Sequence, residues 1–166
     1  MKNVKTAVVH PIPPLYDENS RVLILGSFPS VKSREEGFFY GHRQNRFWRV
    51  VSAVCGDETP QTIEEKKAML TANHIALWDV IHSCEITGSS DSSIKNVVPN
   101  DISMILKNAP IEKIFVNGKK AEQMYKKYIE PVTGISATVL PSTSPANAAI
   151  SLAELEEKWK IIIRSK

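Results

Sequence analysis

The chain has 166 residues, of which 42% are hydrophobic, and a formal net charge of +3 at pH 7. This length and composition predict a single domain over residues 1–166 with a sizeable buried core. No apolar run reaches the ~18 residues that a membrane-spanning helix needs, so no membrane partner is expected. The small positive charge permits binding to nucleic acid without requiring it.

The N-terminal segment and the cysteines bear on the compartment and on metal binding. Pro11, Pro13 and Pro14 stand where a secretory signal would have a long apolar stretch. Cys55 and Cys84 are the only cysteines, which argues against a disulfide scaffold and against a cysteine-held zinc or iron–sulfur centre. We therefore expect a reduced, cytoplasmic protein.

Four short apolar runs predict strands, at residues 21–26, 75–80, 113–116 and 135–140. Three of them are nearly continuous apolar runs, which are typical of strands covered on both faces of a parallel sheet. Helices are predicted between and after these strands, where capping residues precede apolar positions at helical spacing. They are residues 60–72 after a Thr59 cap, a short helix after Asp101, residues 119–129, and a last helix opened by Ser151 and Glu154.

The alternation of strands and helices predicts a three-layer α/β domain with a mostly parallel sheet. In such sheets, ligands bind beyond the carboxyl ends of the strands. The segments at those ends are polar or rich in turn residues, and they comprise residues 27–33, 79–83, 117–118 and 141–147. We expect the functional site at this edge of the sheet.

Three segments carry residue types that are suited to binding a nucleotide. Residues 26–30 (GSFPS) combine a glycine, which permits close approach of a ligand, with a proline that stiffens the turn. Residues 40–48 (YGHRQNRFW) concentrate aromatic rings that stack on bases with basic and amide groups that contact phosphate or base edges. Residues 140–147 (LPSTSPAN) place small hydroxyls, which suit phosphate contacts, in a proline-stiffened loop.

Each segment also has a purely structural interpretation. The first would be a tight turn between a strand and a helix, and the third a hydroxyl-stabilised turn that leads to the Ser151 cap. The second would be a helix start that sends Phe47 and Trp48 into the core. We expect Phe47 or Trp48 to be a core residue under either interpretation.

These segments, in this order, resemble the motifs of a known family. GSFPS and LPSTSPAN closely resemble the two signature motifs of the uracil-DNA glycosylase superfamily, and residues 39–48 resemble its branch called DNA-deoxyinosine or hypoxanthine-DNA glycosylases. The similarity extends over about residues 21–159. It implies a three-layer α/β/α sandwich around a four-stranded, mostly parallel sheet. It also implies a monofunctional enzyme that hydrolyses the N-glycosidic bond of a deaminated base, hypoxanthine above all, flipped out of DNA.

The resemblance implies a catalytic role for Asn45. Many members of the superfamily have an acidic residue or Asn at the position of Phe28, and a phenyl ring can neither activate nor bind water. The branch that this chain resembles uses the Asn of its Gln-Asn-x-Phe-Trp stretch instead, which is Asn45 here. Asn45 would hold the water or contact the base edge, and it would act by positioning because an amide is a weak base.

The resemblance places the base among Ser27, Phe28, Ser30, Asp79 and Asn117. Other members often have a bulky aromatic residue at the position of Ser30, so the smaller side chain would leave room for a purine. Phe28 would stack on the base or pack beneath the loop. Asp79 stands where relatives carry an amide that reads the base edge. An ionised carboxylate there would accept the N1–H of hypoxanthine, and Asp79 would equally suit a loop cap.

The last motif is expected to contact the DNA strand, through Ser142, Ser144, Pro145, Ala146 and Asn147. Several relatives have a His that stabilises the leaving base at the position of Ser142, so that stabilisation would come from backbone amides or from His42. Base release needs neither a metal nor a redox cofactor, and we expect none. A monomer is expected because a base-flipping enzyme of this size needs no partner subunit.

Two other functions remain open at this stage. One is a glycosylase of the same superfamily that acts on uracil or on a G:T or G:U mismatch. The other is a DNA-binding relative that has lost catalysis, since Phe28 and Ser142 replace groups that act in relatives. A small-molecule nucleotide enzyme is disfavoured because neither GxGxxG nor GxxxxGK follows the first strand.

Overall fold

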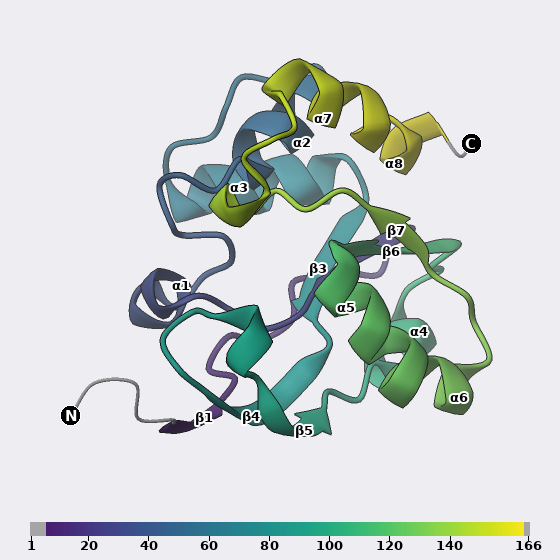
Figure 1. Cartoon of the computed structure of the whole chain (residues 1–166). Coiled ribbons are helices and arrows are strands. Elements are labelled where there is room, and N and C mark those ends of the chain that lie inside the picture. Colours follow the sequence, from purple (N-terminus) through teal and green to yellow (C-terminus); the bar gives the residue numbers. More distant parts are fainter. Residues whose placement is uncertain (1–5, 165–166) are drawn as a thin grey trace.

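A parallel sheet of four strands forms the centre of the molecule, in the order β3-β2-β6-β7 (Figure 1). The structure is a computed structural model that describes residues 6–164. Every residue of the inner strand β2 is buried because both faces of the sheet are covered, as its continuous apolar run predicts. The strands are β2 (Val22–Gly26), β3 (Ile75–Asp79), β6 (Lys113–Asn117) and β7 (Thr138–Leu140).

The four predicted strands are confirmed, and three of them have boundaries within one residue of the prediction. Strand β7 begins at Thr138 and not at residue 135. The hydroxyl of Tyr125 donates a hydrogen bond to the carbonyl of Ile135 (2.7 Å) and holds that residue in the connection before the strand. Only the last part of the predicted run is therefore available to pair with β6, through register partners such as Val139 and Val116.

Helices cover both faces of the parallel sheet, which confirms the three-layer α/β/α sandwich (Figure 1). One face carries α2 (Phe47–Cys55), α3 (Ile63–Ala72), α7 (Leu152–Trp159) and α8 (Ile161–Arg164). The other carries α4 (Ser103–Asn108), α5 (Lys119–Met124), the π-helical turn Tyr125–Ile129 and α6 (Glu130–Thr133). Helix α1 (Val31–Glu36) follows β2, and 3-10 turns lie at Asp91–Ser93 and Pro145–Asn147. No helix in the described part of the chain is long and apolar enough to cross a membrane.

The start of α3 differs from the prediction. The hydroxyl of Thr62 accepts the backbone N–H of Glu65 (3.1 Å), and the Glu65 carboxylate accepts the N–H of Thr62 (3.3 Å), which makes a reciprocal capping box. The predicted cap at Thr59 is wrong because that hydroxyl pairs with a serine hydroxyl of α2 instead. The predicted cap of α7 is confirmed, since the Ser151 hydroxyl accepts the N–H of Glu154 (3.1 Å).

A second, antiparallel sheet was not predicted from the sequence. Only Val80 separates β3 from β4 (Ile81–Ile86), the middle strand of this sheet. Buried residues of β4, such as Cys84 and Ile86, alternate with more exposed ones. The sheet brings the N-terminal strand, and His10 just after it, to the carboxyl end of β3. Its order is β1 (Thr6–Val9), β4 (Ile81–Ile86), β5 (Lys95–Pro99).

Candidate active site

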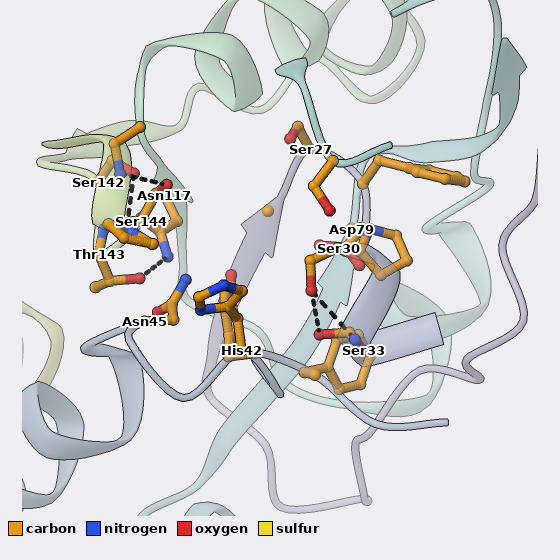
Figure 2. A pocket seen from close by; sticks show the side chains of 18 residues that line it. Ser27, Ser30, Ser33, His42, Asn45, Asp79, Asn117, Ser142, Thr143 and Ser144 are labelled. Atoms are coloured by element: carbon orange, nitrogen blue, oxygen red, sulfur yellow. Dashed lines mark hydrogen bonds between the residues drawn. The ribbon is translucent and has the colours of Figure 1, made fainter. Parts of the chain in front are cut away.

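A cleft of about 260 Å³ opens at the carboxyl ends of the parallel strands (Figure 2). All three motif segments contribute to its wall. The predicted site residues that line it are Ser27, Phe28, Ser30, Asn45, Asp79, Asn117, Ser142, Ser144, Pro145 and Ala146. Asn147 is not part of this wall. Its Nδ2 donates a hydrogen bond to the carbonyl of Ser142 (3.0 Å) and so braces the last motif from within.

An aromatic pair secures the segment that connects α1 to α2. The ring of Tyr40 stacks on that of Phe47, with 4.0 Å between centroids and 12° between planes. Phe47 and Trp48 are both buried, so the expected core role is confirmed. Tyr40 also has a positive φ of 53°, which is uncommon for a residue with a side chain and is maintained by its packing. The backbone between Tyr40 and Phe47 is therefore held in one shape.

Asn45 lies within this segment, and the backbone orients its amide. The Oδ1 atom accepts a hydrogen bond from the N–H of Phe47 (2.9 Å), so the Nδ2 group is directed into the cleft (Figure 2). Asn45 consequently offers a ligand two N–H donors. The same contact satisfies one of the N–H groups that a helix start leaves without an intrahelical partner.

His42 also lines the cleft, and the sequence did not place it there. The backbone N–H of Gln44 donates to its Nδ1 (3.1 Å), which leaves the proton of the neutral ring on Nε2. The N–H of Asn45 bonds to the carbonyl of His42 (2.9 Å), and this tight turn brings both side chains to one wall (Figure 2). The ring is thereby a second hydrogen-bond donor on the Asn45 side.

Asp79 ends β3 and is 3% exposed. Its Oδ2 lies 2.7 Å from Nε2 of His10, a buried residue that sequence analysis does not connect with the site. The N–H of Ile12 donates to the other ring nitrogen, Nδ1 (3.2 Å), so Nε2 carries the proton and donates to the carboxylate. The second oxygen, Oδ1, occupies the space that a side chain at Gly26 would need, which explains the glycine at this position.

A pair of reciprocal hydrogen bonds holds the last motif against β6. The Nδ2 of Asn117 donates to the Thr143 hydroxyl (3.0 Å), and the Asn117 Oδ1 accepts the N–H of Thr143 (3.1 Å). Thr143 is completely buried. Gly118 lets this contact form, since a Cβ there would lie 3.0 Å from the Cβ of Ser142. The predicted base contact of Asn117 stays a prediction, while its observed contacts position the loop.

The hydroxyl oxygens of the two serines in the last motif each accept a backbone hydrogen bond within a turn. The Ser142 hydroxyl accepts the N–H of Ser144 (3.0 Å), and the Ser144 hydroxyl accepts the N–H of Ala146 (3.1 Å). Both hydroxyls are thus acceptors toward the backbone, and their O–H groups can donate outward. The last motif therefore forms the hydroxyl-stabilised turn of the structural interpretation. The same two hydroxyls can also donate to a phosphate.

Arg46 and Trp159 fasten the last motif to the helices. The guanidinium of Arg46 donates to the carbonyls of Ile150 (2.7 Å) and Asn147 (2.9 Å). The indole N–H of Trp159 donates to the carbonyl of Pro141 (2.9 Å). The two ends of the loop are thereby fixed to α2 and α7, and Arg46 is committed to the protein's own backbone.

The first motif combines packing with access to the cleft. Phe28 is 9% exposed, its ring meets His10 edge to face at 5.8 Å, and the guanidinium of Arg34 lies 5.5 Å from the ring centroid. Burial lowers the pKa of that guanidinium. The Ser30 hydroxyl accepts the N–H of Ser33 (3.1 Å) and caps α1, while the residue still lines the cleft. Whether Phe28 stacks on a base stays a prediction.

The two walls of the cleft differ in the hydrogen-bonding groups that they present. Figure 2 shows Asp79 and Ser30 on one side of the cleft, and Asn45, Asn117 and the serines of the last motif on the other. A flat polar ligand between them would meet a carboxylate acceptor on one edge and N–H or O–H donors on the opposite edge. Within residues 6–164, no group of three or more His, Cys, Asp or Glu side chains is arranged to hold a metal ion.

Comparison with known proteins identifies the family. The model of the uracil DNA glycosylase superfamily matches residues 13–163, which is nearly the whole chain. The chain belongs to the uracil DNA glycosylase superfamily. It is similar to a protein named hypoxanthine DNA glycosylase from Methanosarcina acetivorans, with 37% identity over 92% of this chain and 96% of that protein. A protein of the same name from Methanosarcina barkeri is 33% identical over 89% of this chain and 92% of its own length.

A solved structure supports the same membership. The solution NMR structure of a candidate uracil DNA glycosylase from Methanosarcina acetivorans superposes with a TM-score of 0.76 and 35% sequence identity. The match covers 91% of this chain and 96% of that one. The α/β/α sandwich with its four-stranded parallel sheet is therefore the fold of this superfamily member.

Proposed function

We propose that this chain is a DNA glycosylase that releases hypoxanthine from DNA as a first step of base excision repair. The names of the two Methanosarcina relatives support this substrate, and superfamily membership supports the reaction class. The observation that carries the proposal is the polarity of the cleft. The Asp79 carboxylate suits the N1–H of a deaminated purine, and donors on the opposite wall suit its acceptors.

The last motif would hold the DNA strand. Its outward O–H groups at Ser142 and Ser144, and the backbone turn at Pro145 and Ala146, suit contacts to phosphates beside the flipped nucleotide. Asn147 would act by bracing this loop. We also propose that the chain is a single domain over residues 1–166 that acts as a monomer, since a domain of this size can hold the whole site. Both cysteines, which lie within the described residues, are thiols, and this supports a reducing, cytoplasmic setting.

The reaction replaces the glycosidic bond with a bond to water. The C1′–N bond breaks with its electron pair going to the base, a water oxygen bonds to C1′, and the water proton leaves to solvent or to the base. Asn45 would hold the water oxygen or a base acceptor through Nδ2, so its contribution is positioning. His42 would donate its Nε2–H to the departing base anion, which supplies the stabilisation that relatives obtain from another His.

The test is a strand-cleavage assay on labelled duplexes with one hypoxanthine, uracil or xanthine, followed by hot alkali to break abasic sites. Hypoxanthine is expected to be released fastest. The variant Asn45→Ser keeps an oxygen that can cap α2 but removes Nδ2, and it should slow release by about 100-fold, a typical cost of lost positioning. Gln44→Ala, an exposed neighbour, is the matched control. Equal rates for Asn45→Ser and wild type would overturn the role of Asn45.

The same assay separates the alternatives. Release of uracil in preference to hypoxanthine would keep the superfamily and reject the purine pocket, and the description of the solved relative as a candidate uracil DNA glycosylase makes this outcome worth testing. Binding to damaged DNA without any release would indicate a relative that has lost catalysis. In that case Phe28 and Ser142, which replace groups that act in relatives, would be the cause to examine.

A further inference from the structure

His10 is a buried polar residue beside the cleft that lies outside the three motif segments. Its side chain is 1% exposed, and its ring meets Phe28 and Trp78 edge to face, at 5.8 and 6.3 Å between centroids. It stands just after β1 and reaches Asp79 across 69 positions of the sequence. The hydrogen bond thus joins two nearly buried side chains, one at the end of β3 and the other in the segment that follows β1.

The surroundings fix both the orientation and the tautomer of this ring. The N–H of Ile12 donates to Nδ1, so Nδ1 has no proton and Nε2 donates to the Asp79 Oδ2 at 2.7 Å. The rings of Phe28 and Trp78 pack edge to face against the His10 ring in this orientation. The carboxylate is held in turn, because its Oδ2 is engaged and its Oδ1 fills the space above Gly26 at the floor of the cleft.

We propose that His10 is a positioning residue that keeps Asp79 as a hydrogen-bond acceptor for the ring N–H of a deaminated base, which lets the cleft reject adenine. This inference rests on the proposed function. Hypoxanthine, xanthine and uracil carry an N–H in the middle of the Watson–Crick edge, whereas adenine and cytosine carry a bare nitrogen acceptor there. A carboxylate held in one orientation accepts the N–H of hypoxanthine and repels the bare N1 of adenine.

The role of His10 follows from what Asp79 would do without it. Without the hydrogen bond from His10, the Asp79 carboxylate could rotate about its side-chain bonds and turn its oxygens away from a ligand N–H. The Nε2–H of His10 holds Oδ2, so that Oδ1 keeps its place above Gly26 and the carboxylate presents one fixed edge to a ligand. The nearby donors of the opposite wall, Asn45 and His42, face the other edge of the ligand and do not replace this function.

The experiment measures binding to duplexes that carry 2′-fluoro-deoxyinosine or 2′-fluoro-deoxyadenosine, since the fluorine slows glycosidic cleavage. The preference of the wild type for the inosine duplex should fall about tenfold in His10→Phe, which keeps a ring but loses the N–H donor. His10→Gln, whose amide can donate near the Nε2 position, should recover part of the preference. His82→Phe, an exposed histidine on β4, is the matched control and should keep it.

The outcomes are distinct from those of the proposed function. If the wild type releases hypoxanthine but His10→Phe keeps the full preference, or His10→Gln recovers none of it, the role of His10 is overturned and the glycosylase function stands. If the wild type releases no base, both fail. Long-range proton–nitrogen NMR of the wild type adds a test that needs no variant. A protonated Nε2 with a bare Nδ1 supports the proposal, and the opposite tautomer overturns it.

Discussion

Removing the guanidinium of Arg46 should destabilise the protein by loosening the loop of the last motif, residues 140–147. Arg46→Met keeps most of the aliphatic stem and loses the two hydrogen bonds to the carbonyls of Ile150 and Asn147. Each bond from a charged donor contributes roughly 1.5–3 kcal/mol, and partial exposure places the pair near the lower end. We therefore expect a loss of about 3 kcal/mol in the free energy of unfolding.

Urea unfolding followed by tryptophan fluorescence measures this loss directly. For a chain of this size, about 3 kcal/mol corresponds to a decrease of roughly 6–12 °C in Tm. Arg49→Met is the matched control, because Arg49 is an exposed residue of the same helix. If Arg46→Met unfolds at the same urea concentration as Arg49→Met, the guanidinium does not fasten the loop and the reasoning is refuted.

Three further outcomes are expected. Ser30→Tyr should slow hypoxanthine release at least tenfold by filling the cleft. The control Ser30→Ala removes only the α1 cap, which contributes about 1 kcal/mol to stability. Similar release rates for the two variants would reject the argument that Ser30 leaves room for a purine. Arg43→Ala, at an exposed position beside the cleft, should lower the slope of log affinity against log salt by about one, and an unchanged slope would exclude a phosphate contact. Burial and the Asp57 carboxylate raise the pKa of Cys55 to about 11, so its alkylation should be slow at pH 8 and accelerate toward pH 11, as peptide mass spectrometry would report; rapid alkylation at pH 8 would contradict the raised pKa.

The parallel sheet could be predicted because each of its strands is marked by a short apolar run in the local sequence. The buried runs at Val22–Gly26 and Ile75–Asp79 are short and nearly continuous apolar segments, which is a short-range pattern. The antiparallel sheet could not, because Thr6–Val9 is short and its pairing with Ile81–Ile86 joins distant parts of the chain. Long-range pairing of this kind leaves little trace in a single sequence.

The candidate site was predictable to the extent that it lies in motifs. Asn45 and the last motif were found by resemblance, and the structure brings them together at one cleft. The orientation of the Asn45 amide could not be predicted, since it depends on a hydrogen bond to the Phe47 backbone. His10 was missed because its significance arises from a contact with Asp79 that crosses two sheets, and a lone histidine after a short strand carries no signal of it.

The central claim is that this superfamily member releases hypoxanthine from DNA. The most direct measurement incubates the wild-type protein with a duplex that contains one deoxyinosine and identifies the released product by chromatography and mass spectrometry. We expect free hypoxanthine and an abasic strand in equal amounts, with matched adenine duplexes left intact. An intact deoxyinosine strand at enzyme excess, under conditions in which the protein binds the duplex, would contradict the claim.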